Sequence, residues 1–298
     1  MNIEQCIILA AGFGTRMGPI GKKLPKVMWP LFEYSLLESQ ILFAKSLGIK
    51  KIYINTHHQA ELIKISSKVN ENISVQLIHE EDILGSGGGI HNILNQSDID
   101  KKKPVLILNS DVFYMIDTDS IKEALTELDK NKNIKTILFP VKCNKNDSYN
   151  RLRIENKKLK EIIPKNVPSE FNTTYSGVSI CHPDRLENSK GESAFFTTIA
   201  NYKNEDVFVA EDRGWEYWDF GTYNLYHKEI FKTLHKALDK KNSTFVNYLL
   251  EQNIIIKENL NFKTRSYKSI DLETLCFLNN QFKVNSKEII YGEVRQII

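Results

Sequence analysis

Short apolar runs alternate with helically spaced apolar positions along the first 130 residues. The apolar runs lie at 6–9, 52–54, 75–78 and 105–108. Helical spacing is found at 36–47, 61–69, 90–94 and 120–128, and the third of these follows a glycine-rich turn. Continuous apolar runs are typical of strands buried on both faces of a parallel sheet. The alternation therefore predicts right-handed crossovers and a mixed, mainly parallel sheet.

The rest of the chain follows a different pattern. It predicts a hairpin from 151–154 and 159–163, strands at 175–181, 207–209 and 215–220, and a helix at 222–238. Further on, helical spacing appears at 246–250 and 272–278, and a strand is expected at 287–291. We divide the chain into a body, 1–240, and a small C-terminal extension, 241–298, whose role the pattern does not assign.

Composition excludes several classes of protein. The 298 residues are 41% apolar and 26% charged, as in soluble globular proteins, and the net charge of +3 comes from interspersed signs. Nucleic acid is therefore not expected as the main partner. No apolar run is long enough for a membrane span, and no secretory leader is recognised. Four scattered cysteines without a CxxC pair favour a reducing, cytoplasmic compartment.

A glycine-containing loop after the first strand carries the strongest chemical signal. In the segment 9–26, Gly12 and Gly14 let backbone amides approach a phosphate, Arg16 can bind phosphate oxygens in bidentate fashion, and Lys26 adds a charge. Met17 stands where a dinucleotide fingerprint needs its third glycine. The spacing of a Walker A loop is also absent.

Two other elements complete the candidate chemistry. The stretch 80–90 combines Glu80 with a run of glycines, and its carboxylate can only accept hydrogen bonds. Asp111 ends the fourth strand, and Asp219 precedes a helix. Mg²⁺ prefers one or two carboxylates together with substrate phosphates and water. Ligands of parallel sheets gather at the C-terminal strand ends, so the loops after these strands are the expected site.

The loop 12–30 resembles the signature Gly-x-Gly-Thr-Arg-Leu/Met-x-Pro-Leu-Thr-x-x-x-Pro-Lys-Pro-Leu-x-Pro of the sugar-1-phosphate nucleotidyltransferases, with Gly21, Val27 and Met28 as departures. The stretch 80–88 resembles a second motif of that family. The resemblance implies a Rossmann-like three-layer α/β/α fold and an EC 2.7.7-type reaction that joins a nucleoside triphosphate to a sugar 1-phosphate. It covers about 3–235.

Site residues follow from this resemblance. Arg16, Lys26 and Asp111 would be catalytic, with Mg²⁺ held by Asp111 and Asp219. The nucleotide would contact Ala10, Ala11, Gly12, Gly14, Thr15, Arg16, Lys26, Glu80, Gly85 and Ser86. The sugar would contact Asn109 and Gly177. Many relatives bind the sugar phosphate with a lysine that follows a glutamate, and Lys165 would take its place here.

Three alternatives remain open for function. The chain is most similar to N-acetylmuramate-1-phosphate uridylyltransferases, through Leu-Ala-Ala-Gly at 9–12, the triple glycine 87–89 and Trp-Asp-Phe-Gly-Thr at 218–222. The Ala11 methyl would narrow the base pocket and favour a pyrimidine. A mannose- or heptose-1-phosphate guanylyltransferase is the rival. A non-catalytic regulatory homologue is the third, although all four charged positions are kept. The apolar segment 245–250 makes a homo-oligomer a further hypothesis.

Overall fold

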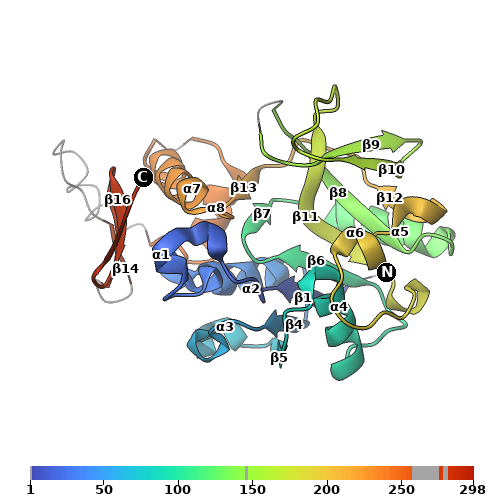
Figure 1. Ribbon diagram of the computed structural model, residues 1–298, viewed down its shortest axis with the longest axis horizontal. Helices are drawn as coiled ribbons and strands as arrows, with labels where there is room; N and C mark the ends of the chain where they lie inside the picture. Colours follow the sequence, from blue (N-terminus) through green and yellow to red (C-terminus); the bar gives the residue numbers. More distant parts are fainter. Residues whose placement is uncertain (1, 145–146, 240, 257–274, 278–280) are drawn as a thin grey trace.

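The computed structural model describes residues 2–144, 147–239, 241–256, 275–277 and 281–298. At its centre is a nine-stranded sheet (Figure 1). In spatial order its strands are β5 (Ser74–His79), β4 (Lys51–Thr56), β1 (Gln5–Leu9), β6 (Val105–Asn109), β11 (Thr173–Cys181), β8 (Thr136–Lys142), β12 (Val207–Val209), β10 (Lys158–Ile163) and β9 (Arg151–Glu155). The first four are parallel and β11 is antiparallel to its neighbours. The predicted parallel core and the hairpin of β9 and β10 are confirmed.

Helices cover both faces of the sheet, which confirms the three-layer fold. They are α1 (Gly18–Gly21), α2 (Leu36–Ser46), α3 (Ser67–Asn70), α4 (Gly85–Gln96), α5 (Thr118–Lys130), α6 (Phe195–Thr198), α7 (Tyr223–Leu238) and α8 (Thr244–Glu251). Ile41 of α2, Leu125 of α5 and Ile230 of α7 belong to one apolar cluster, whereas Ile93 of α4 and Phe195 of α6 belong to another. Within the described residues, no helix is both long and apolar enough to span a bilayer.

One expected helix is interrupted. The prediction of a continuous helix at 61–69 is wrong, because the structure has a short 3₁₀ turn at Ala60–Leu62 and only one helical turn in α3. The Glu38 carboxylate accepts the Ser66 N–H at 2.9 Å. In a continuous helix this N–H would donate to the carbonyl four residues earlier. The competing side chain thus ends the first turn and lets the next one begin.

The glycine run at 85–89 is helical rather than a turn in front of a helix. It forms the first turns of α4, which was expected to begin near Ile90. A Cβ on Gly88 would lie 2.4 Å from the Gly191 carbonyl oxygen, and one on Gly87 would lie 2.5 Å from the Ala194 carbonyl oxygen. The glycines are needed because the backbone of 191–194 packs directly on the helix.

A small ribbon and a separate sheet complete the fold. The ribbon pairs β7 (Val112–Tyr114) with β13 (Tyr217–Asp219), and a short hairpin pairs β2 (Pro30–Leu31) with β3 (Tyr34–Ser35). The second sheet consists of β14 (Leu275–Phe277), β15 (Phe282–Val284), β16 (Glu288–Tyr291) and β17 (Val294–Ile297). Helical spacing at 272–278 was therefore misleading for 275–277, which pair with β15, while 272–274 and 278 lie outside the described residues.

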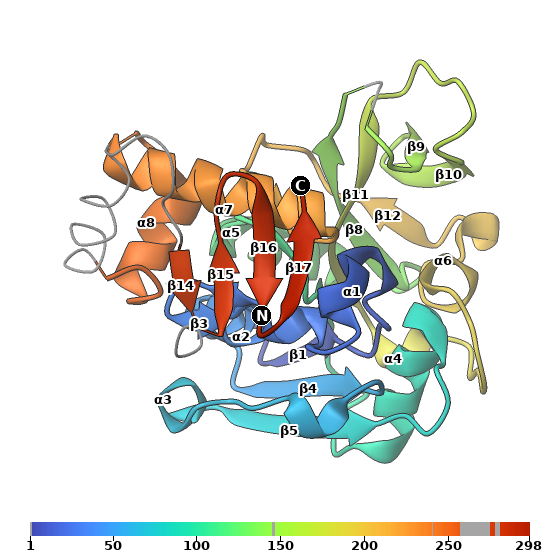
Figure 2. The same cartoon turned by 60° about the vertical axis from the view of Figure 1, so that its left-hand side comes forward.

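The described part of the C-terminal extension packs against the body. Figure 2 shows the small sheet in front of α7 and beside α1. In α8, Phe245 and Leu249 are fully buried and the Tyr248 hydroxyl donates to the Ser39 carbonyl at 2.6 Å. The apolar segment that was expected to mediate assembly is thus covered by the chain itself. The extension and the body share one apolar cluster.

Candidate active site

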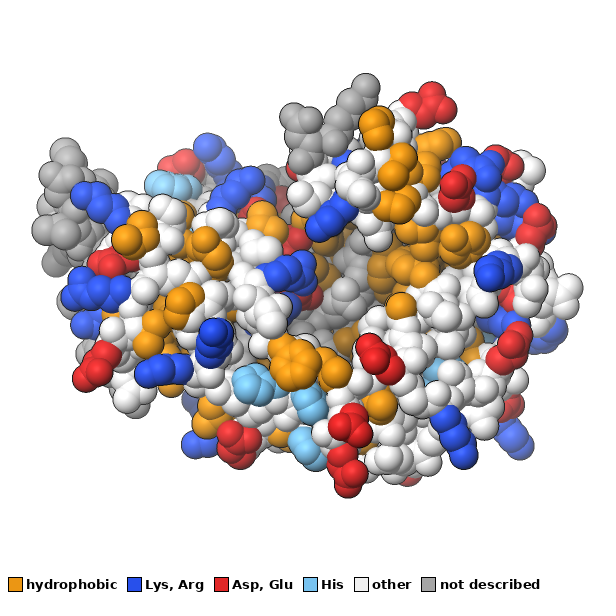
Figure 3. All heavy atoms as spheres, viewed as in Figure 1, with side chains coloured by type: hydrophobic (Ala, Val, Ile, Leu, Met, Phe, Trp, Pro, Cys, Tyr) orange, Lys and Arg blue, Asp and Glu red, His pale blue; other side chains and the backbone are white. Residues whose placement is uncertain are grey.

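A cavity of about 280 Å³ lies at the C-terminal ends of β4, β1 and β6, where a parallel sheet is expected to bind its ligand. Figure 3 shows a hollow in the middle of this face of the molecule. Ten of the predicted site residues line the cavity: Ala10, Ala11, Gly12, Arg16, Lys26, Glu80, Gly85, Ser86, Asn109 and Asp111. The tertiary structure therefore brings both sequence motifs to one place.

A buried ion pair lies at one side of the cavity. The Lys26 ammonium donates to Oδ2 of Asp111, and the two side chains are only 16% and 14% exposed. Burial alone would raise the pKa of the Asp111 carboxyl, but the charges of Lys26 and Arg16 outweigh it and hold that pKa below its usual value. Arg16 itself is exposed at the cavity rim. The carboxylate is thus ionised, and the guanidinium is accessible to an anion.

Asp219 reaches the same place from the opposite direction. Antiparallel pairing of β13 with β7 sets Asp219 opposite Val112, next to Asp111. A Cβ on Gly221 would lie 2.8 Å from Oδ1 of Asp219 and 3.1 Å from Oδ2 of Asp111, so both carboxylates border one small space beside this glycine. Burial, together with the Asp111 charge, raises the pKa of Asp219 although Tyr149 and the Gly221 N–H donate to it.

The two carboxylates fit a hard divalent cation. They converge beside Gly221, which leaves a cradle that a side chain would fill. Oxygen ligands from one or two carboxylates are what Mg²⁺ takes when substrate phosphates and water supply the rest. Across the described part of the chain, no group of three or more His, Cys, Asp or Glu side chains could hold a metal ion. A cation here would therefore depend on phosphate oxygens.

A hydrogen-bonded chain fixes the opposite wall of the cavity. Glu80 is 1% exposed, its Oε1 accepts from the Asn55 amide at 2.7 Å and its Oε2 accepts from the Leu84 N–H at 3.1 Å. Asn55 in turn accepts the Ala10 N–H at 2.8 Å. Gly89 leaves room for this pair, because its Cβ would lie 2.6 Å from both side chains. This series of hydrogen bonds links the first motif, at Ala10, to the second motif, at Glu80, through Asn55 of β4.

Several predicted residues lie outside the cavity lining. Gly14 has a left-handed backbone with φ 62° and precedes the 3₁₀ turn that Thr15 begins. Gly177 lies beside Asn109, because its Cβ would meet the Asn109 amide nitrogen at 3.0 Å. Lys165 is exposed after β10, and its backbone N–H donates to Asn150 at 3.0 Å. The structure therefore joins two of the three expected sugar-side residues.

The start of α4 is occupied by protein groups. The N–H groups of Gly87 and Gly88 donate to the Ser193 carbonyl at 2.8 and 3.2 Å, and Ser86 Oγ accepts the Phe195 N–H at 3.0 Å. Free N–H groups at a helix start would attract an anion. Here the Gly87 and Gly88 donors already have partners, so these two glycines provide close packing rather than an anion cradle.

Sequence reasoning left out three residues of the site. Asn55 lies one residue before the end of β4 and lines the cavity, Tyr149 donates to Asp219, and Gly221 makes room for the carboxylates. A polar residue at the end of a buried parallel strand was a usable signal for Asn55. Tyr149 carries no such local signal, since it meets Asp219 only through the tertiary fold.

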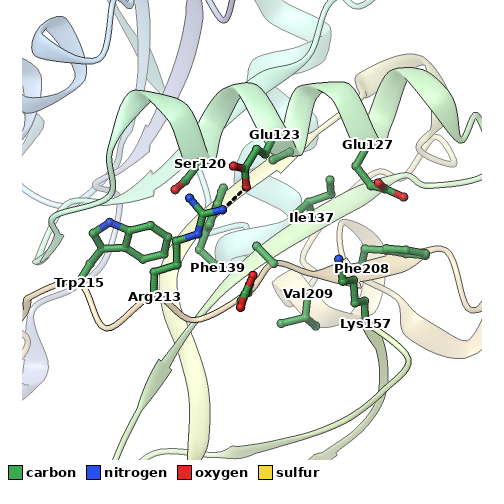
Figure 4. Close-up of a pocket in the computed structure, with 13 residues that line it drawn as sticks. Ser120, Glu123, Glu127, Ile137, Phe139, Lys157, Phe208, Val209, Arg213 and Trp215 are labelled. Atoms are coloured by element: carbon green, nitrogen blue, oxygen red, sulfur yellow. Dashed lines mark hydrogen bonds and ion pairs between the residues drawn. The ribbon is translucent and has the colours of Figure 1, made fainter.

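A second cavity, of about 120 Å³, lies between α5, β8, β12 and the segment after β12. Figure 4 shows Arg213 and Glu123 facing each other across it, with Trp215 at one end and Glu127 and Lys157 at the other. The Arg213–Glu123 ion pair measures 2.5 Å. No predicted site residue lines this cavity, so it is separate from the candidate active site.

Comparisons with known proteins identify the family. The sequence model of the nucleotidyl transferase family matches residues 5–236. The bifunctional protein GlmU of Buchnera aphidicola is 36% identical over 157 residues, which are 53% of this chain and 32% of that protein. The D-glycero-alpha-D-manno-heptose 1-phosphate guanylyltransferase of Campylobacter jejuni is 33% identical over 120 residues, 40% of this chain and 52% of that protein.

Solved structures confirm the fold. HddC from Yersinia pseudotuberculosis, complexed with GMP-PN, superposes with a TM-score of 0.61 over 77% of this chain and 99% of its own, at 21% identity. The matches to the two curated relatives span about a third and about a half of their lengths. Since the family model covers most of the chain and all the cavity-lining positions, the protein belongs to the nucleotidyl transferase family, among the sugar-1-phosphate nucleotidyltransferases.

Proposed function

We propose that this protein transfers a uridylyl group from UTP to a sugar 1-phosphate of the N-acetylmuramate or hexose type and releases pyrophosphate. The observation that carries the proposal is the convergence of Arg16, Lys26 and Asp111 on one cavity, with Asp219 beside Asp111. Two cationic side chains next to two carboxylates suit a polyphosphate that arrives with a cation.

Each charged group has a defined task in this reaction. The exposed Arg16 guanidinium binds the β- and γ-phosphates, for which its planar donors are suited. Lys26, held in place by Asp111, neutralises charge at the reacting α-phosphate. The sugar phosphate oxygen attacks the α-phosphorus in line with the departing pyrophosphate. Positioning and charge neutralisation supply most of the rate, so no protein nucleophile is required.

Mg²⁺ is the proposed cofactor. Asp111 and Asp219 would hold it, and when bound it would neutralise phosphate charge in the site. The raised pKa of Asp219, caused first by burial and then by the neighbouring Asp111 charge, supports a site that a cation completes. Tyr149 and the Gly221 N–H orient this carboxylate from behind.

Two residues favour a pyrimidine base. The Ala11 side chain lines the cavity, and we infer that its methyl group narrows the space for the base. Both carboxylate oxygens of Glu80 already accept a protein donor, which suits one further donor, uracil N3–H, better than the paired donors of guanine. UTP and GTP turnover should be compared on a panel of sugar 1-phosphates. Faster turnover of UTP is expected, and activity with GTP alone would refute the uridylyl assignment.

A guanylyltransferase is the second candidate. The observation in its favour is the similarity to the Campylobacter heptose 1-phosphate guanylyltransferase, together with a buried acceptor, Glu80, in the cavity wall. The same nucleotide panel decides between the two, with mannose and heptose 1-phosphates among the acceptors. Asn109 and Gly177 are the proposed sugar contacts, and Lys165, exposed after β10, is the proposed phosphate contact.

A regulatory protein without turnover is the third candidate, and one assay separates it from an enzyme. Pyrophosphate release should be measured for the wild type, for Asp111→Ala and for the surface control Asp129→Ala. Asp129 forms an ion pair with Lys132 on an exposed helix end and does not line the cavity. A loss of about 10²–10³-fold is expected for Asp111→Ala alone. Equal rates for all three proteins would remove Asp111 from the mechanism.

A further inference from the structure

The small C-terminal sheet contacts the first motif on both sides of its charged residues. β17 lies against α1, two residues beyond Arg16, as Figure 2 shows. On the other side, the Phe282 ring of β15 packs edge-on against Trp29, with ring centroids 5.2 Å apart. Trp29 follows Lys26 by three residues. The sheet thus contacts the segment that carries both phosphate-binding side chains at its two ends.

The contact at Gly18 has an unusual geometry. A Cβ there would lie 2.6 Å from Oε1 of Gln296 and 2.7 Å from both Cδ and Nε2. Because the three amide atoms are equally near, the amide plane lies flat over the glycine. Gly18 also has φ 64°, in the left-handed region. The loop therefore approaches β17 as closely as a backbone without a side chain permits.

The Gln296 amide is buried without a partner. The residue is 6% exposed, and within the described part of the chain neither Nε2 nor Oε1 has a hydrogen-bond partner. Buried polar groups are nearly always satisfied, so an unpaired amide against a ligand-binding loop calls for an explanation. Gly18 has no side chain to hold the loop backbone away from this amide, so a small shift of the backbone there would give the amide a partner.

The sheet itself is firmly attached to the body. Phe282 is fully buried and also contacts Tyr226 of α7, with ring centroids 6.0 Å apart. The Asn285 carbonyl contacts His227 Nε2 of the same helix at 2.7 Å. The Tyr226 hydroxyl donates to the Pro30 carbonyl at 2.5 Å, just beyond Trp29. The sheet is therefore a fixed support against which the loop can be positioned.

We propose that the C-terminal sheet positions the triphosphate-binding loop and that the Gln296 amide hydrogen-bonds to the loop backbone near Gly18 when a nucleoside triphosphate is bound. Gln296 is a positioning residue, since it acts through the loop that carries Arg16. The proposal rests on the proposed function in one respect, which is that Arg16 contacts the phosphates. It gives the C-terminal extension a role in substrate binding.

The test measures nucleotide binding directly. Binding of UTP and of GTP, each without sugar phosphate so that no turnover occurs, is followed by calorimetry for wild type, Gln296→Ala and Gln296→Met. Methionine keeps the length and packing of the side chain but has no amide. Both variants should bind the preferred nucleotide about tenfold more weakly, the worth of one hydrogen bond. The KM for that nucleotide should rise in parallel, while kcat and the KM for sugar 1-phosphate stay near wild type.

Arg295→Ala is the matched control. Arg295 lies next to Gln296 on β17, but its side chain is 71% exposed and contacts only Glu288 at 3.7 Å among the described residues. It should bind nucleotide as the wild type does, and all variants should melt within a few degrees of one another. Wild-type binding by Gln296→Met would overturn the proposed hydrogen bond. A fall in kcat and in melting temperature with unchanged nucleotide affinity would overturn the positioning role.

Failure of the proposed function would look different. In that case the wild type itself would bind neither UTP nor GTP, and Arg16→Ala would have no effect. If instead the wild type binds a nucleotide, Arg16→Ala weakens it and the Gln296 variants do not, only the positioning role is refuted.

Discussion

The two carboxylates of the candidate active site lie side by side in unlike surroundings. Asp111 faces Lys26, and that cation together with Arg16 lowers its pKa in spite of burial. Asp219 faces Tyr149, and burial together with the Asp111 charge raises its pKa. One carboxylate is therefore neutralised by the chain itself. The other bears a charge that the protein alone stabilises poorly, as expected where a cation arrives with the substrate.

The largest effect should come from removing each charge in turn. Asp111→Asn and Asp219→Asn are both expected to lower pyrophosphate release by about 10²–10³-fold, because each would remove a ligand of the proposed Mg²⁺, whose charge would stabilise the phosphates. Without metal, their stabilities should differ. Asp111→Asn leaves the buried Lys26 ammonium unpaired and should cost about 2 kcal/mol, while Asp219→Asn should cost less than about 0.5 kcal/mol.

Denaturant unfolding in the presence of a chelator measures this difference. Equal destabilisation by the two substitutions would show that the carboxylates are not distinguished by their surroundings. A double variant that combines Lys26→Met with Asp111→Asn extends this test. It should recover part of the stability that Asp111→Asn alone loses, because no buried ammonium is then left unpaired. No recovery in the double variant would argue against the ion pair as the cause.

The next effect concerns the space that the two carboxylates share. Gly221→Ala places a methyl group 2.8 Å from Asp219 and 3.1 Å from Asp111. We expect activity to fall by about 10²-fold, because small displacements of reacting groups are costly. Gly214→Ala is the control, since its Cβ would meet nothing within 4 Å although its φ is 72°. Initial rates of both variants should be measured at saturating substrate. Equal rates would contradict a special role for the space beside Gly221.

A smaller loss of activity is expected from removing the hydrogen bond that Tyr149 donates to Asp219. Tyr149→Phe removes only the hydroxyl group that donates to this carboxylate, and about a tenfold loss of activity is expected from the loss of one hydrogen bond. Tyr175→Phe is matched to it, because that hydroxyl bonds to Ser179 at 3.0 Å in the sheet, away from the cavity lining. A steady-state comparison in which both variants keep full activity would separate Tyr149 from the mechanism.

The smallest effect is one of stability and pH. Glu216, in the segment leading to β13, accepts from Ser243 at 2.7 Å and from Lys236 at 2.9 Å. Burial opposes ionisation, but these donors outweigh it and lower the pKa of Glu216 below 4.5. Its contribution is therefore present above pH 4.5 and lost as the pH falls through the lower folded-state pKa.

Glu216→Gln should consequently cost about 0.5 kcal/mol at pH 7, since the group is partly exposed, and less at pH 3. Urea unfolding of wild type and variant at both pH values measures the difference. A gap that widens toward low pH would have the wrong sign for this explanation.

Local patterns were sufficient for most of the body. The apolar runs gave β1, β4 and β6, because a strand buried on both faces must be continuously apolar. The run at 75–78 gave β5, although this edge strand is largely exposed. The loop with Arg16 and Lys26 was recognisable from the sequence because its glycines, prolines and charged residues all lie within one short stretch of the chain. Prediction failed where a distant group intervened. Glu38 interrupts the helix expected at 61–69, and the glycine run is part of α4 because the backbone of 191–194, distant in sequence, requires residues without side chains there.

The sequence by itself determined the family, the parallel core and the residues of each motif, because these depend on contiguous chain. The tertiary structure alone decided that Asp219 meets Asp111, that Asn55 links Glu80 to Ala10, and that Gln296 covers Gly18. Such contacts join residues separated by 25 to 278 positions. They depend on strand order and register, which the side-chain pattern along a single chain does not specify.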